Sequence, residues 1–270
     1  MIEENPWWST GEVPRELLPE KSRFAFKEIQ QSFKEPFAHF IIGPRNAGKT
    51  TIIYQLINFL LKQGTNPKHI LYCSLEKEPT DLVALLNDYR REILRKDLKT
   101  ESAWIFLDEI HYAKDWIQKL AAIVKANPGL RVIASSSLAI DRLMPPFQEK
   151  PWFKIHRVPP LLFYEFLHFK GEKIPRVEGL EDAETFGQML KLNLRSFVRR
   201  GFPEIIESTD TFVTRYIEEM ILTRVIYRDL LEAFRIEDPG LAYRVAREIL
   251  ESPGQTVNVS AIAAKFNRAR

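Results

Sequence analysis

The chain has 270 residues, of which 45% are hydrophobic and 28% charged, the balance of a globular protein in water. This length allows one sizeable domain and a smaller one. No apolar run is long enough to span a membrane, and the acidic start lacks an apolar signal core, so we expect a cytoplasmic protein without membrane contact. The net charge of +3 argues little by itself, but neither residues 1–165 nor residues 166–270 have the basic surplus of a dedicated nucleic-acid binder, although a local basic face stays open. The single cysteine, Cys73, excludes an internal disulfide and lies in an apolar run, where a buried thiol is expected.

The first twenty residues contain Pro6, Pro14 and Pro19 and predict an irregular arm. Trp7 and Trp8 have two interpretations. They pack the arm against the domain, which residue statistics favour, or they form the wall of a binding pocket. The helical spacing of apolar residues then predicts a helix over residues 21–33.

A glycine-rich loop follows next, between an apolar strand over residues 37–42 and an apolar-periodic helix over residues 51–61. The loop fits the pattern G-x-x-x-x-G-K-[ST], the P-loop that binds nucleotide phosphates. A chance glycine turn would lack the strand before the loop and the helix after it. The residues expected to bind the nucleotide are Gly43, Pro44, Arg45, Asn46, Ala47, Gly48, Lys49, Thr50 and Thr51.

The loop offers backbone N–H groups and the positive end of a helix to a polyphosphate. We expect Lys49 to reach the β- and γ-phosphates and the Thr50 hydroxyl to bind Mg²⁺. A second strand over residues 70–75 and a helix over residues 79–97 come next.

The strand predicted over residues 103–107 ends in Asp108 and Glu109, the pattern of a Walker B strand. We expect Asp108 to hold Mg²⁺ and Glu109 to activate the attacking water as a general base. Strand ends often carry acids, but the position after a P-loop and one further strand–helix unit favours this role. His111 and Tyr112 are more often loop packing than catalytic groups.

A helix is predicted from residue 115 to 124 and a strand over residues 130–137, where Ser135 and Ser136 lie near the tip. In P-loop enzymes with a catalytic glutamate, such a strand lies between the P-loop and Walker B strands, and a polar side chain at its tip contacts the γ-phosphate or the water. The alternative is that the serines cap the following helix. A last strand is predicted over residues 152–158, before two prolines.

From residue 161 onward the pattern is helical, with helices over residues 183–199, 210–235 and 241–251. Arg199 and Arg200 end the first of these helices. Either of them could contact the γ-phosphate, which is often worth 10³–10⁵ in rate, or complement the helix dipole. A final helix from residue 261, with Ser260 as its cap, resembles the opening of a helix-turn-helix or winged helix whose DNA-reading helix is missing. The chain is then either a truncated fragment or one that ends in a simple terminal helix.

These motifs together resemble prokaryotic ATP-binding proteins of the AAA+ superfamily, in which the ATPase domain precedes a helical segment, a winged helix and often a nuclease-like domain. The chain departs from the family pattern at Asn46 and Ala47, where a second Arg and a Val are usual, and at Ala134, where Gly is usual. The resemblance implies ATP and Mg²⁺ as ligands and a sheet with the P-loop strand central. The motifs that carry it are residues 5–8, 43–51, 107–110 with Trp116, Arg157 with 160–167, and 201–204.

We therefore expect an α/β fold, a P-loop NTPase three-layer sandwich with a mostly parallel five-stranded sheet, followed by an all-α lid and the start of a winged helix. The expected parts are an arm and helix over residues 1–35, an ATPase core over 36–165, a lid over 166–240 and a winged-helix start over 241–270.

Two functions follow from the same pocket. The first is an ATPase that hydrolyses ATP to ADP and phosphate and couples the nucleotide state to lid movement. The second is a slow ATP-dependent switch that controls binding of DNA or protein through the C-terminal helices. A small-molecule kinase is less favoured because no acceptor site is evident and two adjacent carboxylates suit water better. A homo-oligomer stays open.

Overall fold

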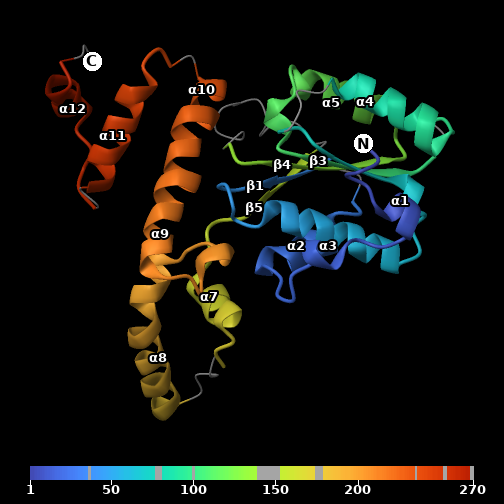
Figure 1. Ribbon diagram of the computed structural model, residues 1–270. Helices are drawn as coiled ribbons and strands as arrows, with labels where there is room; N and C mark the ends of the chain where they lie inside the picture. The colour runs from blue at the N-terminus through green and yellow to red at the C-terminus, as the bar shows by residue number, and fades with distance from the viewer. Residues whose placement is uncertain are drawn as a thin grey trace. The chain divides into compact units, whose positions relative to one another are not determined.

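The computed structural model describes residues 1–35, 38–76, 81–98, 101–138, 153–173, 179–234, 236–251 and 254–267 (Figure 1). Contacts within the chain divide it into two compact units, Met1–Ser208 and Thr209–Arg270, and each is described by itself.

A five-stranded sheet forms the centre of the first unit. Its strands run in parallel in the order β2-β3-β4-β1-β5, which confirms the expected five-stranded sheet. Strand β4 lies between β1, which precedes the glycine-rich loop, and β3, which ends in Asp108, as expected, and it also takes the middle place that the resemblance implied for β1. The strands are β1 (Ala38–Ile42), β2 (Ile70–Ser74), β3 (Ala103–Asp108), β4 (Leu130–Ser136) and β5 (Phe153–Arg157).

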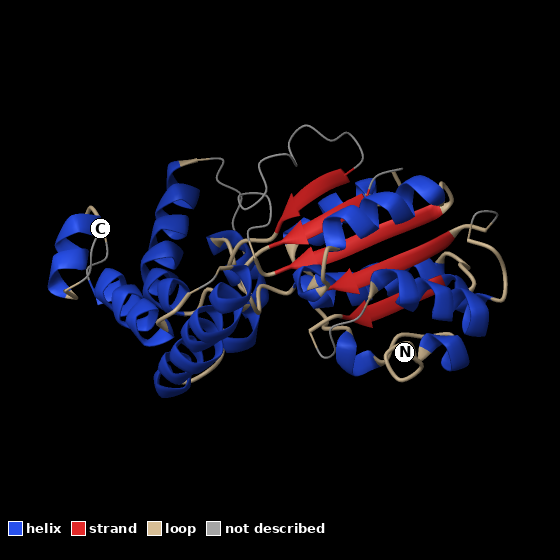
Figure 2. Cartoon of the chain, turned by 90° about the horizontal axis from the view of Figure 1, so that it is seen from above, coloured by secondary structure: helices blue, strands red, loops and turns tan. Residues whose placement is uncertain are grey.

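Helices cover both faces of this sheet (Figures 1 and 2). One face packs against α1 (Trp7–Thr10), α2 (Phe24–Ser32) and α3 (Lys49–Lys62). The other packs against α4 (Leu82–Asp88) and α5 (Trp116–Ala126). Both faces are apolar because a parallel sheet is buried on both sides.

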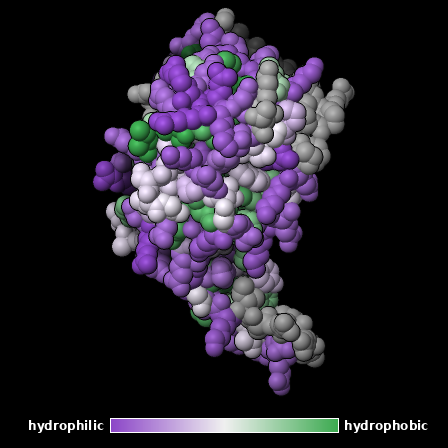
Figure 3. All heavy atoms as spheres, turned by 90° about the vertical axis from the view of Figure 1, so that its right-hand side faces the viewer, coloured by the Kyte–Doolittle hydropathy of each residue, from purple (hydrophilic) through white to green (hydrophobic). Residues whose placement is uncertain are grey.

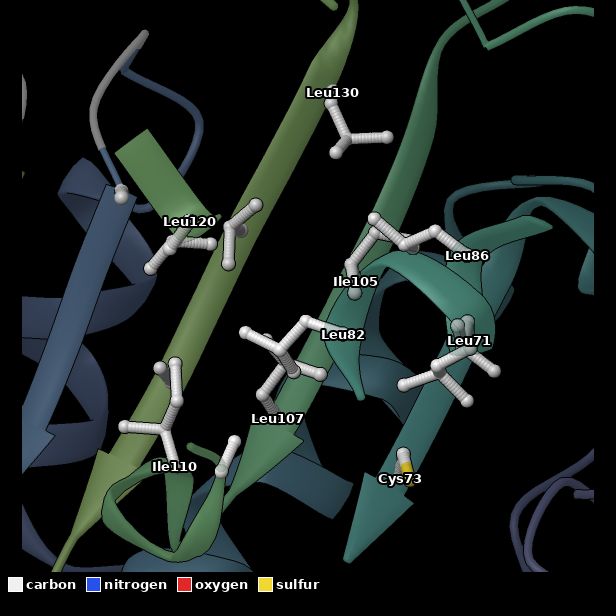
Figure 4. Packing of buried hydrophobic residues seen from close by; sticks show 14 of the residues in the cluster. Leu71, Cys73, Leu82, Leu86, Ile105, Leu107, Ile110, Leu120 and Leu130 are labelled. Carbon is white, nitrogen blue, oxygen red and sulfur yellow. The ribbon is translucent and has the colours of Figure 1, made fainter. Parts of the chain in front are cut away.

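Figure 4 shows the second of these cores at close range. Leu82 and Leu86 of α4 and Leu120 of α5 belong to one buried cluster with Ile105 and Leu107 of β3. The cysteine, Cys73, is a buried member of the same cluster, as its apolar surroundings in the sequence predicted. This packing fixes the strand whose end carries the two acidic residues.

Two longer helices follow the sheet within the first unit, α7 (Phe163–Lys170) and α8 (Leu180–Arg199). The second unit is helical. It contains α9 (Asp210–Tyr216), π-helical turns over Ile217–Thr223 and Val225–Asp229, α10 (Leu230–Ala233), α11 (Pro239–Glu251) and α12 (Val259–Lys265). Short 3₁₀ turns occur at Arg15–Leu17, Pro67–His69, Ile110–Tyr112 and Pro203–Ile205, and a π-helical turn, Tyr89–Leu94, extends α4.

Several expected boundaries shift or lie outside the described residues. The expected strand starts at Phe37 and Trp152, and the start of the helix at residue 79, lie outside them. Helix α12 is capped by Asn258, whose side chain accepts the Ala261 N–H at 3.0 Å, so the expectation of Ser260 was wrong. A side-chain amide there satisfies one of the free N–H groups of the first turn.

The tryptophans of the arm pack it against the sheet, the interpretation that residue statistics favoured. Both indole N–H groups donate to the Ile70 carbonyl, at 3.0 Å from Trp7 and 2.7 Å from Trp8. In the part of the chain that the structure describes, no helix is long and apolar enough to cross a membrane. The face drawn in Figure 3 shows mostly hydrophilic side chains, with small scattered hydrophobic ones.

Candidate functional site

The P-loop joins β1 to α3 through a backbone that only glycine fits at two positions. A Cβ on Gly43 would lie 2.0 Å from the Val158 carbonyl oxygen, inside any permissible contact. Gly48 precedes α3 with φ at +93°, a conformation that side chains rarely adopt. The loop therefore turns tightly onto the start of the helix, where unpaired N–H groups attract anions.

Lys49, the first residue of α3, is buried, with 4% of its surface exposed. Its ammonium donates to the Pro44 carbonyl at 3.0 Å and lies 3.3 Å from Glu109 Oε1. A buried lysine keeps its charge only where such partners offset its lost hydration. The loop and the end of β3 are thus joined by an ion pair at the place where phosphates are expected.

Asp108 ends β3 with its carboxylate 5% exposed and held by three hydroxyl groups. Thr50 donates to Oδ2 at 2.8 Å, Tyr72 donates to Oδ2 at 3.1 Å, and Ser135 donates to Oδ1. Burial raises the pKa of Asp108, as does the neighbouring Glu109 charge, while the hydrogen bonds from Ser135 and Thr50 oppose that rise. A cation bound here would also oppose that rise.

The oxygen donors at this place fit Mg²⁺. Thr50 Oγ1 and Asp108 Oδ2 are already 2.8 Å apart, and hydroxyl and carboxylate oxygens are the ligands that Mg²⁺ takes in P-loop sites, with phosphate and water completing its shell. Among the described residues, no group of three or more His, Cys, Asp or Glu side chains could hold a metal by itself.

Glu109 follows Asp108 in a left-handed conformation, with φ 54° and ψ 54°, which is uncommon for a residue with a side chain. Its Oε2 accepts the Ser137 N–H at 2.6 Å and lies 3.3 Å from His111 Nδ1. Burial alone would raise the pKa of Glu109, but the charge of Lys49, with His111 and the Ser137 N–H, holds it below the usual value. The carboxylate is therefore ionised and able to accept a proton.

The structure places Ser135 against the acidic residues and Ser136 against His111. Ser135 Oγ, besides donating to Asp108, accepts the Glu109 N–H at 2.9 Å. Ser136 Oγ lies 3.0 Å from His111 Nδ1 and accepts the Leu138 N–H at 3.2 Å. The alternative of a cap on the next helix falls on residues 139–152, outside the described part of the chain.

Two members of this cluster had no assigned role in the sequence. Tyr72 comes from β2, where it counted only as an apolar strand residue, and His111 was expected to be loop packing. The register of β2 on β3, which places Ser74 beside Asp108, could have indicated that Tyr72 comes close. No comparable signal was available for His111.

Arg45, expected at the nucleotide, is buried and extends toward two other elements. Its guanidinium lies 3.1 Å from Glu76 Oε1 and donates to the Tyr112 hydroxyl at 2.5 Å. It also lowers the pKa of Glu109, after the larger effects of burial, Lys49, His111 and Ser137. Arg45 thus ties the P-loop to the segment after β2 and to the turn after Glu109.

Arg200, at the end of α8, donates to the Ser208 carbonyl from Nε at 3.2 Å and from Nη2 at 3.0 Å. These bonds hold together the loop after the helix, which favours a structural role. A γ-phosphate contact by Arg199 or Arg200 stays a prediction.

A cavity of about 440 Å³ adjoins the P-loop at Gly48 and Thr51. Its other walls come from the segment before α2 and from the helical part of the first unit. They include Pro19, Arg23, Phe169 and Pro203. A mixed apolar and charged hollow beside a phosphate loop has room for the rest of a nucleotide.

Comparison with known proteins identifies the core. Residues 35–167, just under half of the chain, match the family model described as AAA domain. This segment is similar to AAA domains. The match agrees with the family resemblance that the motifs carry.

Two curated relatives are uncharacterized proteins. The protein from Methanocaldococcus jannaschii is 28% identical over 224 residues, which cover 82% of this chain and 48% of that protein. The protein from Haemophilus influenzae is 24% identical over 232 residues, covering 84% of this chain and 54% of that protein. The chain therefore spans about half the length of the curated relatives that it matches. Among solved structures, the Walker-type ATPase PABY2304 of Pyrococcus abyssi is similar, with 14% identity, 90% and 87% coverage of this and that chain, and a TM-score of 0.42.

Proposed function

We propose that this chain binds Mg²⁺–ATP and hydrolyses it to ADP and phosphate. The observation that carries the proposal is the convergence of Lys49, Thr50, Asp108 and Glu109 from two separate elements into one buried cluster at the P-loop. Ionised groups are costly to bury, and here they lie where a triphosphate and its cation would complete their coordination.

Each group has a role that its contacts support. When a nucleotide binds, the Lys49 ammonium would leave Glu109 and pair with the β- and γ-phosphates. Both partners are anions, and the ammonium already lies at the P-loop. That exchange would remove the Lys49 charge that lowers the pKa of Glu109, so the carboxylate would become a better base to orient a water and accept its proton. Ser135 would hold Asp108 and the Glu109 backbone in register.

Thr50 and Asp108 would hold Mg²⁺, which when bound neutralises charge on the phosphate oxygens. The hydroxyl of Tyr72 would orient the Asp108 carboxylate, since it donates to the same oxygen as Thr50. The base and ribose would occupy the cavity beside Gly48 and Thr51, which is continuous with the loop that holds the phosphates.

The deciding experiment is steady-state ATP hydrolysis with Mg²⁺ by the wild-type chain and by Glu109→Gln, with and without duplex DNA. We expect turnover in the common range of about 1–100 s⁻¹ and a loss of at least about a hundredfold in Glu109→Gln with ATP affinity retained. Stimulation by DNA would identify DNA as a partner.

Tight ATP binding with hydrolysis orders of magnitude slower would favour the slow switch instead. The Lys49–Glu109 ion pair favours this second candidate to a limited extent, because it engages the base until a ligand separates the pair. Absence of ATP binding would refute both functions. Arg199→Ala and Arg200→Ala belong in the same assay, and if both hydrolyse ATP like the wild type, neither arginine contacts the transferred phosphate.

A further inference from the structure

Arg23, directly before α2, forms hydrogen bonds with the P-loop and with two residues that follow β5. Only 4% of it is exposed. Its Nε and Nη2 donate to the two carboxylate oxygens of Glu165 at 2.9 and 3.0 Å, and Nη2 also donates to the Pro159 carbonyl at 2.8 Å. The remaining nitrogen, Nη1, donates to the carbonyl of Ala47, inside the P-loop.

The Ala47 carbonyl determines where the next N–H points. In a planar trans peptide the C=O of one residue and the N–H of the next face opposite ways. By holding the Ala47 oxygen, Arg23 fixes the N–H of Gly48 in the opposite direction, away from the arm. Gly48 has no side chain that could fix this peptide, and its φ of +93° belongs to the most permissive residue, so the restraint must come from outside the loop.

Glu165 anchors the arginine. It is 2% exposed and also accepts the backbone N–H groups of Phe24 at 2.7 Å and Leu162 at 3.1 Å. Burial alone would raise the pKa of Glu165, but the hydrogen bonds from Arg23 and from these two N–H groups hold it low. The pair is therefore charged, and its bidentate geometry fixes the plane of the guanidinium.

The same segment has a second contact with α7. Lys21 donates to the Phe169 carbonyl at 2.8 Å, near the end of the helix whose first turn contains Glu165. Residues 21–24 are thus bound to both ends of α7 as well as to the P-loop.

We propose that Arg23 is a positioning residue for the phosphates of the bound nucleotide, holding the Ala47–Gly48 peptide in the direction that presents the Gly48 N–H to them, with Glu165 as its buried anchor. This inference rests on the proposed function. It assigns a binding role to the segment before α2, where the sequence predicted only an arm and a helix. It also gives α7 a direct connection to the loop.

Arg23 lines the cavity beside the P-loop as well, so a role as a wall for the base would also affect nucleotide affinity. Inorganic pyrophosphate separates the two roles because it has phosphates and no base. A positioning role lowers the affinities for ADP and pyrophosphate by the same factor. A wall for the base lowers only the affinity for ADP.

The test measures ADP binding directly, and Mg²⁺–pyrophosphate binding by competition with labelled ADP, in the wild type and in Arg23→Lys. Lysine keeps the charge but cannot reach Ala47, Pro159 and Glu165 together. We expect both affinities to fall by about ten- to a hundredfold, the usual effect of losing a hydrogen bond to a charged group. Lys154→Gln is the matched control, since Lys154 forms an exposed ion pair with Glu35 that likewise joins the N-terminal segment to the β5 region.

The double variant Arg23→Met/Glu165→Gln separates binding from folding. Replacing both members of a buried ion pair often leaves stability nearly unchanged, and the amide oxygen of the introduced glutamine can still accept a backbone N–H. We expect this variant to keep a near-wild-type Tm and to lose both affinities. Normal pyrophosphate affinity in both variants, with the wild type binding ADP, would overturn this inference alone. A wild type that binds no ADP would overturn the proposed function and this inference together.

Discussion

Two of the clusters of buried polar side chains in the first unit differ in whether their groups are charged. Asp108 and Glu109, at the end of β3, are 5% and 7% exposed, and hydroxyl groups, an N–H group and Lys49 surround them. His39 of β1 and His156 of β5 are 0% and 2% exposed and stack with ring planes at 14°. A hydrogen bond of 2.9 Å joins His39 Nδ1 and His156 Nε2.

The difference lies in the partners. Burial, the largest effect, lowers the pKa of His39, and it lowers the pKa of His156 to about 4, with the His39 and Lys154 charges adding to the shift. Glu28 Oε1, 3.9 Å from His156 Nδ1, is too far for a hydrogen bond. Within the described residues, that Nδ1 has no hydrogen-bond partner. The histidines are therefore neutral, whereas the donors around Glu109 keep it ionised.

The comparison teaches that a buried charge persists in this domain where fixed donors and an opposite charge surround it. The acidic cluster lies at the carboxyl ends of the strands, where the loops supply such groups, whereas the histidines lie under α2, between two strands. Binding sites of open parallel sheets occur at the first of these places. Variants that change the donors or the protons in either cluster test this difference.

The largest expected effect comes from Lys49→Met. Without its ammonium, Glu109 loses the principal charge that holds its pKa low, and the phosphates lose their cation. We expect ATP hydrolysis to fall at least about a hundredfold, measured by phosphate release at saturating Mg²⁺. Lys62→Met, at the exposed far end of the same helix, is the control. A Lys49→Met variant with wild-type turnover would show that the ion pair is only structural.

The second effect concerns stability at acid pH. In the unfolded chain the histidines take up protons as pH falls through about 6.5, but in the folded chain they resist protonation until lower pH. The unfolded state then binds more protons, so the stability is complete above pH 6.5 and declines toward pH 4. For His156 the loss amounts to roughly 3 kcal/mol in the free energy of unfolding.

Denaturant unfolding between pH 7.5 and 4.5 measures this decline. Protonation at the pair would also change its interactions with Glu28, Glu35 and Lys154, so the comparison is made within one buffer series. We expect His156→Gln to flatten the profile. His69→Gln, which replaces a partly exposed ring beside the Ser102 carbonyl, should keep it. Equal slopes in His156→Gln and the wild type would exclude the pair as the cause.

The two clusters also show how much of the fold and of the candidate site could be predicted from the sequence. The P-loop and the acidic end of β3 are local patterns, because the spacing of Gly43, Gly48 and Asp108 within a strand and its loop is enough to predict their roles. The place of Ser135 followed from the expected position of β4 between β1 and β3, which the sheet confirms. These parts could be predicted because chain order and strand order are linked in this kind of fold.

The remaining contacts join residues far apart in the chain. Arg23 and Glu165 are separated by 142 positions, and His39 and His156 by 117. Neither pair belongs to a local pattern, because each side chain alone is compatible with many environments. Their contacts depend on the packing of α2 and α7 beside β5 and the P-loop, which periodicity does not specify.

The smallest expected effect comes from Tyr72→Phe. Tyr72 supplies one of three hydroxyl groups on the Asp108 carboxylate, and its removal leaves Thr50 and Ser135 in place. Losing one neutral donor costs about 1 kcal/mol, so we expect the Mg²⁺ concentration for half-maximal hydrolysis to rise about fivefold while KM for ATP at saturating Mg²⁺ changes little.

Tyr54→Phe is the comparison for this change, because the Tyr54 side chain forms a hydrogen bond with that of Tyr72, while the three hydroxyl groups on Asp108 come from other residues. An equal rise in both variants would mean that the hydrogen-bonded pair of Tyr54 and Tyr72 hydroxyl groups, and not the Tyr72 donor to Asp108 alone, determines the Mg²⁺ requirement. A rise in Tyr72→Phe alone would mean that the number of donors around Asp108 determines how readily its carboxylate binds the cation. The histidine pair, which burial keeps neutral, gives the opposite extreme of the same rule.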